Sequence, residues 1–212
     1  MKRGLFLSFE GGEGSGKSLQ TRELARWLGE RGREVILTRE PGGTPAGERI
    51  REILLHAKET PLTPEAQVLL YSAARAQLVR DVIRPALDAG SIVIADRYFD
   101  STLAYQGYGH GVSLEAIRDV TALAVAGLVP DRTFLLDVAV EIALGRSGWR
   151  AAAKWDRFEV LAADFHERVR EGYRRLAAAE PRRWVVIDGH RDEAAISADI
   201  RREVDSLLGA LA

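Results

Sequence analysis

The chain has 212 residues, of which 46% are hydrophobic and 29% charged, a composition typical of globular proteins with a buried core. Thirty basic and 31 acidic residues leave a formal net charge of −1, which excludes a globally basic nucleic-acid-binding protein. The lack of cysteine excludes disulfides, thiolate metal sites and a thiol nucleophile. Only four of the basic residues are lysines, an imbalance that genome composition explains as well as function does.

No apolar stretch reaches the roughly 20 residues needed to span a bilayer, and the first residues resemble no targeting signal. We therefore expect a cytoplasmic protein without a membrane partner. The sequence shows no linker, internal repeat or low-complexity segment, so we expect one domain over residues 1–212.

Five short apolar runs alternate with segments of helical character. The runs are nearly continuous in apolar residues, which is typical of strands covered on both faces, as in a parallel sheet. In chain order, we expect a strand at 5–9 and a helix at 18–31, a strand at 34–38 and helices at 45–56 and 63–88, a strand at 92–95 and a helix at 113–126, a strand at 133–138 and a helix at 155–180, and a strand at 184–187 and a helix at 193–211. Pro85 is expected to kink or shorten the end of the third helix. This alternation predicts an α/β fold with a doubly wound, five-stranded parallel sheet.

A glycine-rich loop joins the first expected strand to the first expected helix and has the pattern Gly-x-x-x-x-Gly-Lys-Ser. Glycines let the backbone wrap closely around an anion, with its amides pointing inward at the positive end of the helix. In this P-loop pattern Lys17 reaches the β- and γ-phosphates of a nucleotide, and the Ser18 hydroxyl is placed to bind Mg²⁺. The expected phosphate-binding residues are Gly11, Gly12, Glu13, Gly14, Ser15, Gly16, Lys17 and Ser18.

Asp96 stands at the carboxyl end of the third expected strand, where ligands of doubly wound sheets bind. Taken alone, this aspartate fits a turn cap equally well. Next to a P-loop it is better explained as a carboxylate near the metal, in the Walker B position. Ser18 and Asp96 are therefore the expected metal-side residues.

The absence of asparagine argues against a common switch GTPase, whose guanine-recognition motif requires that residue. A small kinase instead holds two anionic substrates together and neutralises charge on the transferred phosphoryl group. Arg39, after the second strand, and Arg97, beside Asp96, fit a second anion site. Tyr71 and Arg75 share a helix face and suit a base pocket, although spacing alone favours a core tyrosine and a solvated arginine.

Five segments together resemble thymidylate kinases of the bacterial type, over nearly the whole chain. They are residues 10–18, 38–44, 71–75, 96–98 and 105–107, and segment 38–44, TREPGGT, is much more specific than the P-loop. The resemblance implies a P-loop fold like that of nucleoside monophosphate kinases, with a helical lid at about residues 145–157. It also implies transfer of the γ-phosphoryl group of ATP to dTMP, with Mg²⁺, giving dTDP and ADP.

The resemblance implies which residues recognise the base and the phosphate of dTMP. Tyr71 takes the place of an aromatic residue that stacks on thymine, Arg75 resembles the residue that bonds the base edge, and Gln106 lies beside the base. Arg39 and Arg97 take the places of the clamp on the dTMP phosphate.

Further roles follow from the same resemblance. Glu13 resembles a loop carboxylate that contacts the sugar 3′-hydroxyl, and Tyr105 takes the place of the residue that disfavours a 2′-hydroxyl. Arg51 is expected to assist the phosphate clamp, and Asp96 to act near Mg²⁺.

The source of the catalytic arginine separates subtypes of this family. Some relatives carry it inside the P-loop, where this chain has Gly14, whereas in the bacterial type the resemblance implies arginines of the lid. Arg150 is the one we expect to reach the phosphates, with Arg146 and Arg157 as alternatives. The expected catalytic residues are Lys17, Asp96, Arg97 and Arg150.

Two alternatives remain open. One is a kinase of the same fold acting on another nucleotide or a deoxynucleoside, although a deoxynucleoside would leave Arg39 and Arg97 without a phosphate to hold. The other is a regulator that binds ATP without transferring phosphate, against which the second anion site and the arginine-rich lid argue. Because the family usually forms homodimers, we also expect a homodimer, with no nucleic-acid partner.

Overall fold

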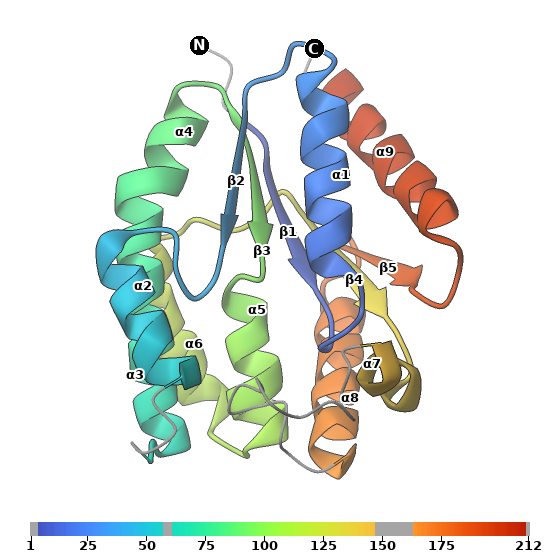
Figure 1. Cartoon of the computed structure of the whole chain (residues 1–212). Helices are drawn as coiled ribbons and strands as arrows, with labels where there is room; N and C mark the ends of the chain where they lie inside the picture. Colours follow the sequence, from blue (N-terminus) through green and yellow to red (C-terminus); the bar gives the residue numbers. More distant parts are fainter. Residues whose placement is uncertain (1–3, 57–60, 147–162, 211–212) are drawn as a thin grey trace.

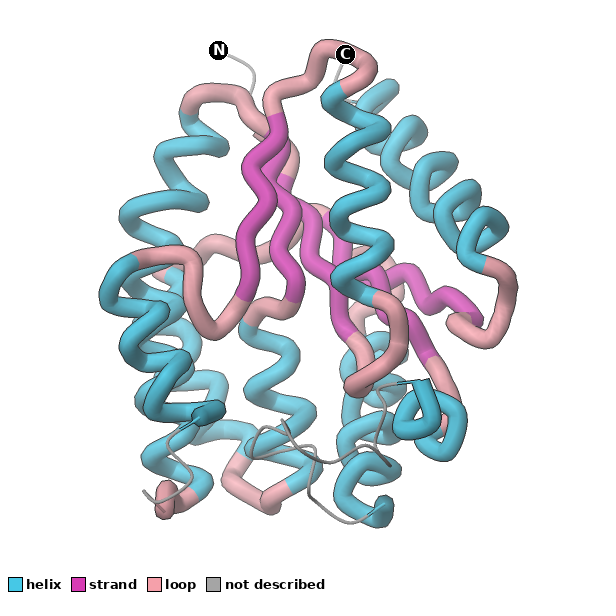
Figure 2. The backbone as a smooth tube through the Cα atoms, in the orientation of Figure 1, coloured by secondary structure: helices cyan, strands magenta, loops and turns pink. Residues whose placement is uncertain are grey.

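The computed structural model describes residues 4–56, 61–146 and 163–210, and a five-stranded parallel sheet forms its centre (Figures 1 and 2). The strands are β1 (Phe6–Glu10), β2 (Val35–Arg39), β3 (Ile92–Asp96), β4 (Arg132–Asp137) and β5 (Trp184–Asp188). Their order across the sheet is β2-β3-β1-β4-β5. The predicted α/β fold with a five-stranded parallel sheet is confirmed, and each strand overlaps its expected range.

The register of the strands brings the segments of the candidate site to one edge of the sheet. Asp96, the last residue of β3, pairs with Phe9 of β1 and with Arg39 of β2. The arrows of β1, β2 and β3 in Figure 1 point toward the same end of the molecule. The loops that follow β1, β2 and β3 therefore emerge next to one another.

Alternate residues of β1 supply two different cores. Leu7 and Phe9 pack with α1 (Lys17–Gly29) and α9 (Glu193–Ala210), which lie together on one face of the sheet (Figure 1). Phe6 packs with the helices on the other face. This burial on both faces explains why the strand is continuously apolar in sequence.

The remaining helical elements cover the other face and the carboxyl ends of the strands. They are α2 (Pro45–Arg51), η1 (Glu52–His56), α3 (Pro64–Leu78), η2 (Val79–Ile83), α4 (Arg84–Asp88), α5 (Phe99–Thr102), η3 (Leu103–Gly109), α6 (Leu114–Val125), α7 (Val140–Arg146) and α8 (Ala163–Ala179), with η marking π-helical segments. The side chains of Thr44, Thr63 and Ser113 each accept a backbone N–H three residues ahead and so cap α2, α3 and α6.

The described helices differ from expectation in several places. The ranges 45–56 and 63–88, expected to be continuous helices, are interrupted by the π-helical segments η1 and η2. Segment η2 ends just before Pro85, which has no N–H to continue the hydrogen-bond ladder. Elements α5, η3 and α7 were not expected. The helix expected at 155–180 is described from residue 163 onward, as α8, and residues 155–162 lie outside the described residues.

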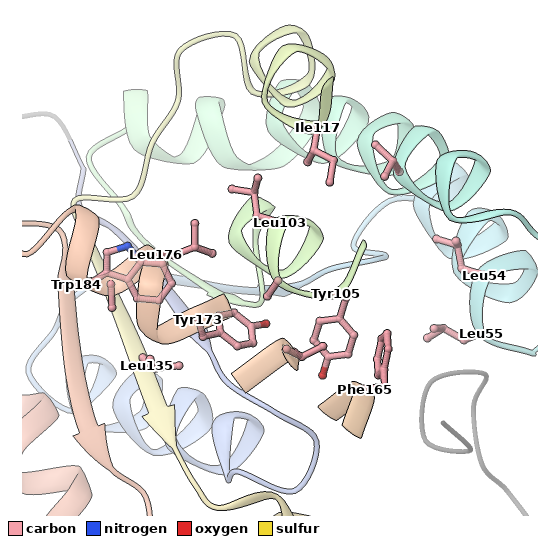
Figure 3. Packing of buried hydrophobic residues seen from close by; sticks show 14 residues of the cluster. Leu54, Leu55, Leu103, Tyr105, Ile117, Leu135, Phe165, Tyr173, Leu176 and Trp184 are labelled. Atoms are coloured by element: carbon pink, nitrogen blue, oxygen red, sulfur yellow. The ribbon is translucent and has the colours of Figure 1, made fainter. Parts of the chain in front are cut away.

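A third core lies among η3, α3, α6 and α8, beside the candidate site (Figure 3). The Tyr105 ring lies between Phe165 and Tyr173, with ring centroids 6.1 Å and 6.4 Å away. This packing fixes the positions of two tyrosine hydroxyls that take part in the site. In the part of the chain that the structure describes, no helix is long and apolar enough to cross a membrane.

Candidate active site

The loop between β1 and α1 has the backbone conformation that an anion-binding loop requires. Gly11, Gly14 and Gly16 have φ angles of 141°, 69° and 95°, in the region that favours glycine. A Cβ atom on Gly11 would lie 2.6 Å from the carbonyl oxygen of Leu136, so this position has no space for a side chain. The glycines of the motif therefore shape the loop.

Lys17 folds back into this loop. Its ammonium donates to the carbonyl oxygens of Gly11 and Gly12, at 3.1 Å and 2.7 Å, and to Ser15 Oγ at 3.3 Å. Burial, helped by the positive charge of Arg97, lowers the pKa of Lys17 to about 8. The negative charge of a phosphate bound in the loop would stabilise the charged form of Lys17.

The P-loop is joined to the end of β3 by a short hydrogen bond. Ser18 Oγ donates to Asp96 Oδ2 at 2.5 Å. Hydroxyl and carboxylate oxygens are ligands that suit Mg²⁺, which keeps several other positions for water and phosphate oxygens. Among the described residues there is no cluster of three or more acidic, histidine or cysteine side chains that would hold a metal by itself. Ser18 and Asp96 thus form a partial site that fits Mg²⁺ only together with a phosphate.

Arg97 lies at the centre of the site and is held from several sides. Its Nη1 donates to Gly11 O at 3.0 Å, to Tyr173 Oη at 3.1 Å and to Ser101 Oγ at 3.2 Å. Its Nη2 forms an ion pair with Glu13 and donates to the Tyr105 hydroxyl at 3.2 Å. The guanidinium is therefore fixed before any ligand is bound.

Glu13 stays ionised in these surroundings. Burial alone would raise the pKa of this carboxyl, but Arg97 and Lys17 outweigh it and lower the pKa to about 2. Glu13 Oε1 also accepts a hydrogen bond from the Tyr105 hydroxyl at 3.3 Å. Glu13 therefore offers a carboxylate acceptor within the site.

Arg75 is buried rather than solvated, which corrects the interpretation that helical spacing alone favours. Its side chain is 1% exposed, and its Nε and Nη2 atoms lie 2.8 Å and 2.7 Å from Glu40 Oε2. Its Nη2 also donates to Thr102 Oγ1 at 3.0 Å. The Glu40–Pro41 peptide bond is cis.

Three buried polar atoms of the residues that line this end of the cavity have no hydrogen-bond partner among the described residues. They are Nη1 of Arg75, a donor, and Oε1 of Gln106 and Oε1 of Glu40, both acceptors. The amide nitrogen of Gln106 donates to Gln67 at 3.1 Å. Because unpaired buried polar groups cost free energy, this end of the cavity is suited to a polar ligand that pairs with them.

A cavity of about 420 Å³ connects these groups. A volume of this size is typical of small-molecule sites. Of the residues expected from the sequence, the cavity is lined by Glu13, Gly14, Gly16, Lys17, Ser18, Arg39, Arg51, Tyr71, Arg75, Asp96, Arg97, Tyr105, Gln106 and Arg146. Gly11, Gly12 and Ser15 shape the P-loop without lining the cavity.

The remaining arginines have different positions. Arg39 is half exposed and pairs with Glu48, its Nη2 lying 2.8 Å from the carboxylate. Arg51 donates to the carbonyl oxygen of Pro41 at 2.9 Å, and Arg146 donates to that of Gly189 at 2.8 Å. Arg150 and Arg157 lie outside the described residues.

Sequence reasoning missed several residues of the site. Glu40 lies within the recognised segment 38–44 but was given no role, and Ser101 and Thr102 belong to the unexpected helix α5. Glu10 and Tyr173 lie just behind Arg97. Glu40 and Glu10 offered a signal, since each is an acidic residue at or just after the carboxyl end of a strand. Tyr173 offered none.

Comparison with known proteins gives a consistent result. A family model described as thymidylate kinase matches residues 9–200. The chain is 48% identical to the thymidylate kinase of Roseiflexus sp. (strain RS-1), over 98% of this chain and 96% of the relative. It is 47% identical to that of Clavibacter sepedonicus, over 98% and 97%. The crystal structure of thymidylate kinase from Ehrlichia chaffeensis matches with a TM-score of 0.77 and 32% identity, over 96% of this chain and 99% of that one.

Proposed function

This chain belongs to the thymidylate kinase family and phosphorylates dTMP to dTDP; from that premise we propose that ATP is the donor and that the residues around the cavity divide between the two substrates as follows. The P-loop holds the donor phosphates, because its glycines have the backbone conformation of an anion-binding loop and Lys17 is folded into that loop. Ser18 and Asp96 hold Mg²⁺ together with phosphate oxygens. When bound, this ion neutralises charge on the transferred group.

The thymine base occupies the end of the cavity near α3 and η3. Its edge presents a carbonyl acceptor beside an N–H donor, which complements the unpartnered Arg75 Nη1 and Gln106 Oε1. The ring of Tyr71 borders the same cavity and stacks on the base. This matched donor and acceptor is the observation that carries the assignment.

The acceptor phosphate lies between the base site and the P-loop. Arg97 is held there in advance, and Arg39 exchanges Glu48 for the phosphate, with Arg51 assisting from the loop that it anchors. Preorganised positive charge lowers the barrier because it needs no rearrangement as charge develops in the transition state.

The sugar lies between the phosphate site and the base. Glu13 accepts from the 3′-hydroxyl, and Tyr105, held by its packing in the third core, leaves no space for a 2′-hydroxyl. Together these contacts fix the phosphate of dTMP in line with the donor.

Charge from a lid completes the site. Arg150 is the proposed lid arginine, with Arg146 and Arg157 as alternatives, and of these three Arg146 is the one described, at the border of the cavity. The single-domain organisation with a lid near residues 145–157, and the cytoplasmic location, stay predictions from the sequence.

We also propose that the chain forms a homodimer through the packed helices α3 and α6. Leu69 on α3 and Leu123 on α6 are 59% and 85% exposed, and large apolar side chains exposed on two neighbouring helices suit a surface that a partner covers. Light scattering of Leu123→Glu and the unmodified protein tests this assignment. We expect the glutamate to shift the mass toward that of a monomer, and an unchanged dimer would place the interface elsewhere.

The base assignment is tested by a panel of nucleoside monophosphates with ATP and Mg²⁺, with ADP release as the readout. We expect dTMP to be the best acceptor among dTMP, dUMP, dCMP and dGMP. Gln106→Leu should raise the KM for dTMP by about tenfold, the effect of about 1.4 kcal/mol, and leave the KM for ATP unchanged. Gln77→Leu, an exposed position on α3, is the matched control and should change neither constant. An unchanged dTMP KM in Gln106→Leu would refute the assignment.

A further inference from the structure

Glu10 is a buried carboxylate directly behind the site, and no role has yet been given to it. It is the last residue of β1, its side chain is 0% exposed, and it does not border the cavity. Its Oε1 accepts from the backbone N–H of Tyr98 at 2.8 Å. Its Oε2 accepts from Ser101 Oγ at 2.6 Å and from Tyr173 Oη at 3.0 Å.

These three partners all surround Arg97. Tyr98 is the next residue in the chain, and the hydroxyls of Ser101 and Tyr173 are two of the acceptors of Arg97 Nη1. A third acceptor of Nη1 is the carbonyl oxygen of Gly11, the residue after Glu10. Glu10 thus contacts the groups that hold Arg97 but makes no hydrogen bond to Arg97 itself.

The backbone at Arg97 needs such support. Its φ angle is 71°, a left-handed conformation that is unfavourable for a residue with a side chain. The N–H of Arg97 donates to the carbonyl oxygen of Phe9 at 3.0 Å, and the next N–H, that of Tyr98, donates to Glu10. The end of β1 and its last side chain therefore hold both amides of the turn.

Glu10 also determines which way the two hydroxyls point. A carboxylate only accepts hydrogen bonds and a guanidinium only donates them, whereas a hydroxyl has a single proton. The hydroxyl oxygens of Ser101 and Tyr173 lie 2.8 Å from each other, and both lie within hydrogen-bond distance of Glu10 Oε2. The two hydroxyl protons are therefore used within this group of three side chains. The lone pairs of both oxygens are then left to accept from Arg97.

We propose that Glu10 is a positioning residue that holds Arg97 in the direction of the acceptor phosphate, acting through Tyr98, Ser101 and Tyr173. The inference rests on the proposed role of Arg97 as a ligand of that phosphate. Figure 3 shows Tyr173 beside Tyr105, the other tyrosine whose hydroxyl meets Arg97. Helix α8 therefore contributes to the phosphate site through a residue that does not touch the substrate.

The charged groups around Glu10 support a positioning role. Burial, with Asp100 adding to it, raises the pKa of Glu10 to about 7, and Arg97 opposes this shift. Lys17 and the ion pair of Asp100 with Arg183 are the other charged groups nearby. A carboxyl buried at this cost and hydrogen-bonded to the partners of a ligand-binding arginine is typical of functional sites.

Calorimetric titration at pH 8 with dTMP and with thymidine, which lacks the phosphate, tests the proposal. In Glu10→Gln, one of the two carboxylate oxygens becomes an NH2 group that donates where the oxygen accepted, so the groups that hold Arg97 rearrange and Arg97 loses its fixed direction. We expect the affinity for dTMP to fall by about tenfold and that for thymidine to change by less than about twofold. Equal losses of affinity for dTMP and thymidine would overturn the proposal, because a general disturbance of the fold weakens both ligands alike. Unchanged affinity for dTMP would overturn it as well.

Further variants separate this inference from the function on which it rests. Arg97→Ala should show the same selective loss for dTMP, and Glu10→Gln should add little to it in the double variant. If Arg97→Ala binds dTMP normally, the phosphate role of Arg97 fails and the inference with it. If Arg97→Ala selectively loses affinity for dTMP and Glu10→Gln does not, the inference about Glu10 fails and the phosphate role of Arg97 stands.

Two further variants test whether a disturbed fold, and not the position of Arg97, explains the loss of affinity. Tyr173→Phe removes one hydroxyl without burying a new polar group and should show a smaller selective loss. Asp100→Asn changes a neighbouring buried carboxylate that binds Arg183 instead, and it should affect dTMP and thymidine alike. A selective dTMP loss in Asp100→Asn, or none in Tyr173→Phe, would contradict the proposed route.

Discussion

The guanidinium of Arg75 and the carboxylate of Glu40 lie 2.7 Å apart, with side chains that are 1% and 4% exposed. The pair joins α3 to the loop that follows β2, two segments that both line the cavity. Burial raises the pKa of Glu40, and the positive charge of Arg75 opposes this effect. The base site is thus built on a charge pair that must stay complete.

We predict that Glu40→Ala lowers the free energy of unfolding by about 3–5 kcal/mol, because it leaves a buried guanidinium without its counter-charge. Urea denaturation at pH 7.5, followed by circular dichroism, measures the change. Glu30→Ala is the matched control, since its pair with Arg26 is exposed at both ends. That substitution should cost less than about 1 kcal/mol. Similar losses in the two variants would show that burial of the Arg75–Glu40 pair has no special effect.

The lowered pKa of Lys17 predicts proton uptake when ATP binds. With a pKa of about 8, roughly half of the Lys17 side chains are neutral at pH 8. The negative charge of the triphosphate raises this pKa, so up to about half a proton should be taken up for each ATP bound. Titration calorimetry in two buffers with different ionisation enthalpies measures that number.

Lys17→Arg is the control for this prediction, because a guanidinium stays charged at pH 8 and has no proton to take up. We expect the uptake to disappear in this variant wherever ATP still binds measurably. Equal uptake by both proteins would place the titrating group elsewhere in the site.

The sheet could be predicted from the sequence because each strand has its own local signal, a short run of apolar residues, which in the central strands β1 and β3 is buried on both faces. The segment Phe99–Gly109 has no such signal. Its helices α5 and η3 begin directly after β3 without a side-chain cap and include glycines at 107 and 109. Close contact with α8 stabilises them, and that contact depends on residues some 60 positions away in the chain.

The site was predictable where its residues form local motifs, as in the P-loop and at Asp96 and Arg97. Helical spacing could not show that Arg75 is buried, because its partner Glu40 is 35 residues away and belongs to another element. The same limit applies to Tyr173, which reaches Glu10 across 163 residues. Local pattern thus identifies the residues that line the cavity better than those that hold them in place.

The end of α6 carries strain that one substitution should relieve. Ala126 has φ 47° and ψ 48°, a left-handed conformation that costs a residue with a Cβ about 1–2 kcal/mol. Ala126→Gly removes this cost, although glycine also makes the unfolded chain more flexible. We predict a net gain in the free energy of unfolding of about 0.5–1 kcal/mol. The exposed Ala122, inside the same helix, is the control, and its change to glycine should lower stability by about 1 kcal/mol. Equal effects in urea denaturation would contradict the explanation.

Gly172 allows α8 to approach η3 closely. A Cβ atom at this position would lie 2.6–2.7 Å from the Cβ, Cγ and Cδ2 atoms of Tyr108, closer than side-chain packing allows. We predict that Gly172→Ala lowers the free energy of unfolding by about 1–3 kcal/mol, the usual cost of overpacking. Because the neighbouring Tyr173 contacts Arg97, the variant should also raise the KM for dTMP more than that for ATP.

Gly29→Ala, at the end of α1, is the matched control for this prediction. A Cβ atom there meets nothing within 4 Å. Alanine favours the helix over glycine by up to about 1 kcal/mol, so this variant should be slightly more stable and should keep both KM values. In thermal and urea denaturation, Gly172→Ala should therefore be less stable than the unmodified protein, and Gly29→Ala should be more stable. If the stability of both variants changed in the same direction, the helical preference of alanine would explain the effect. The close approach of α8 and η3 would then not depend on Gly172.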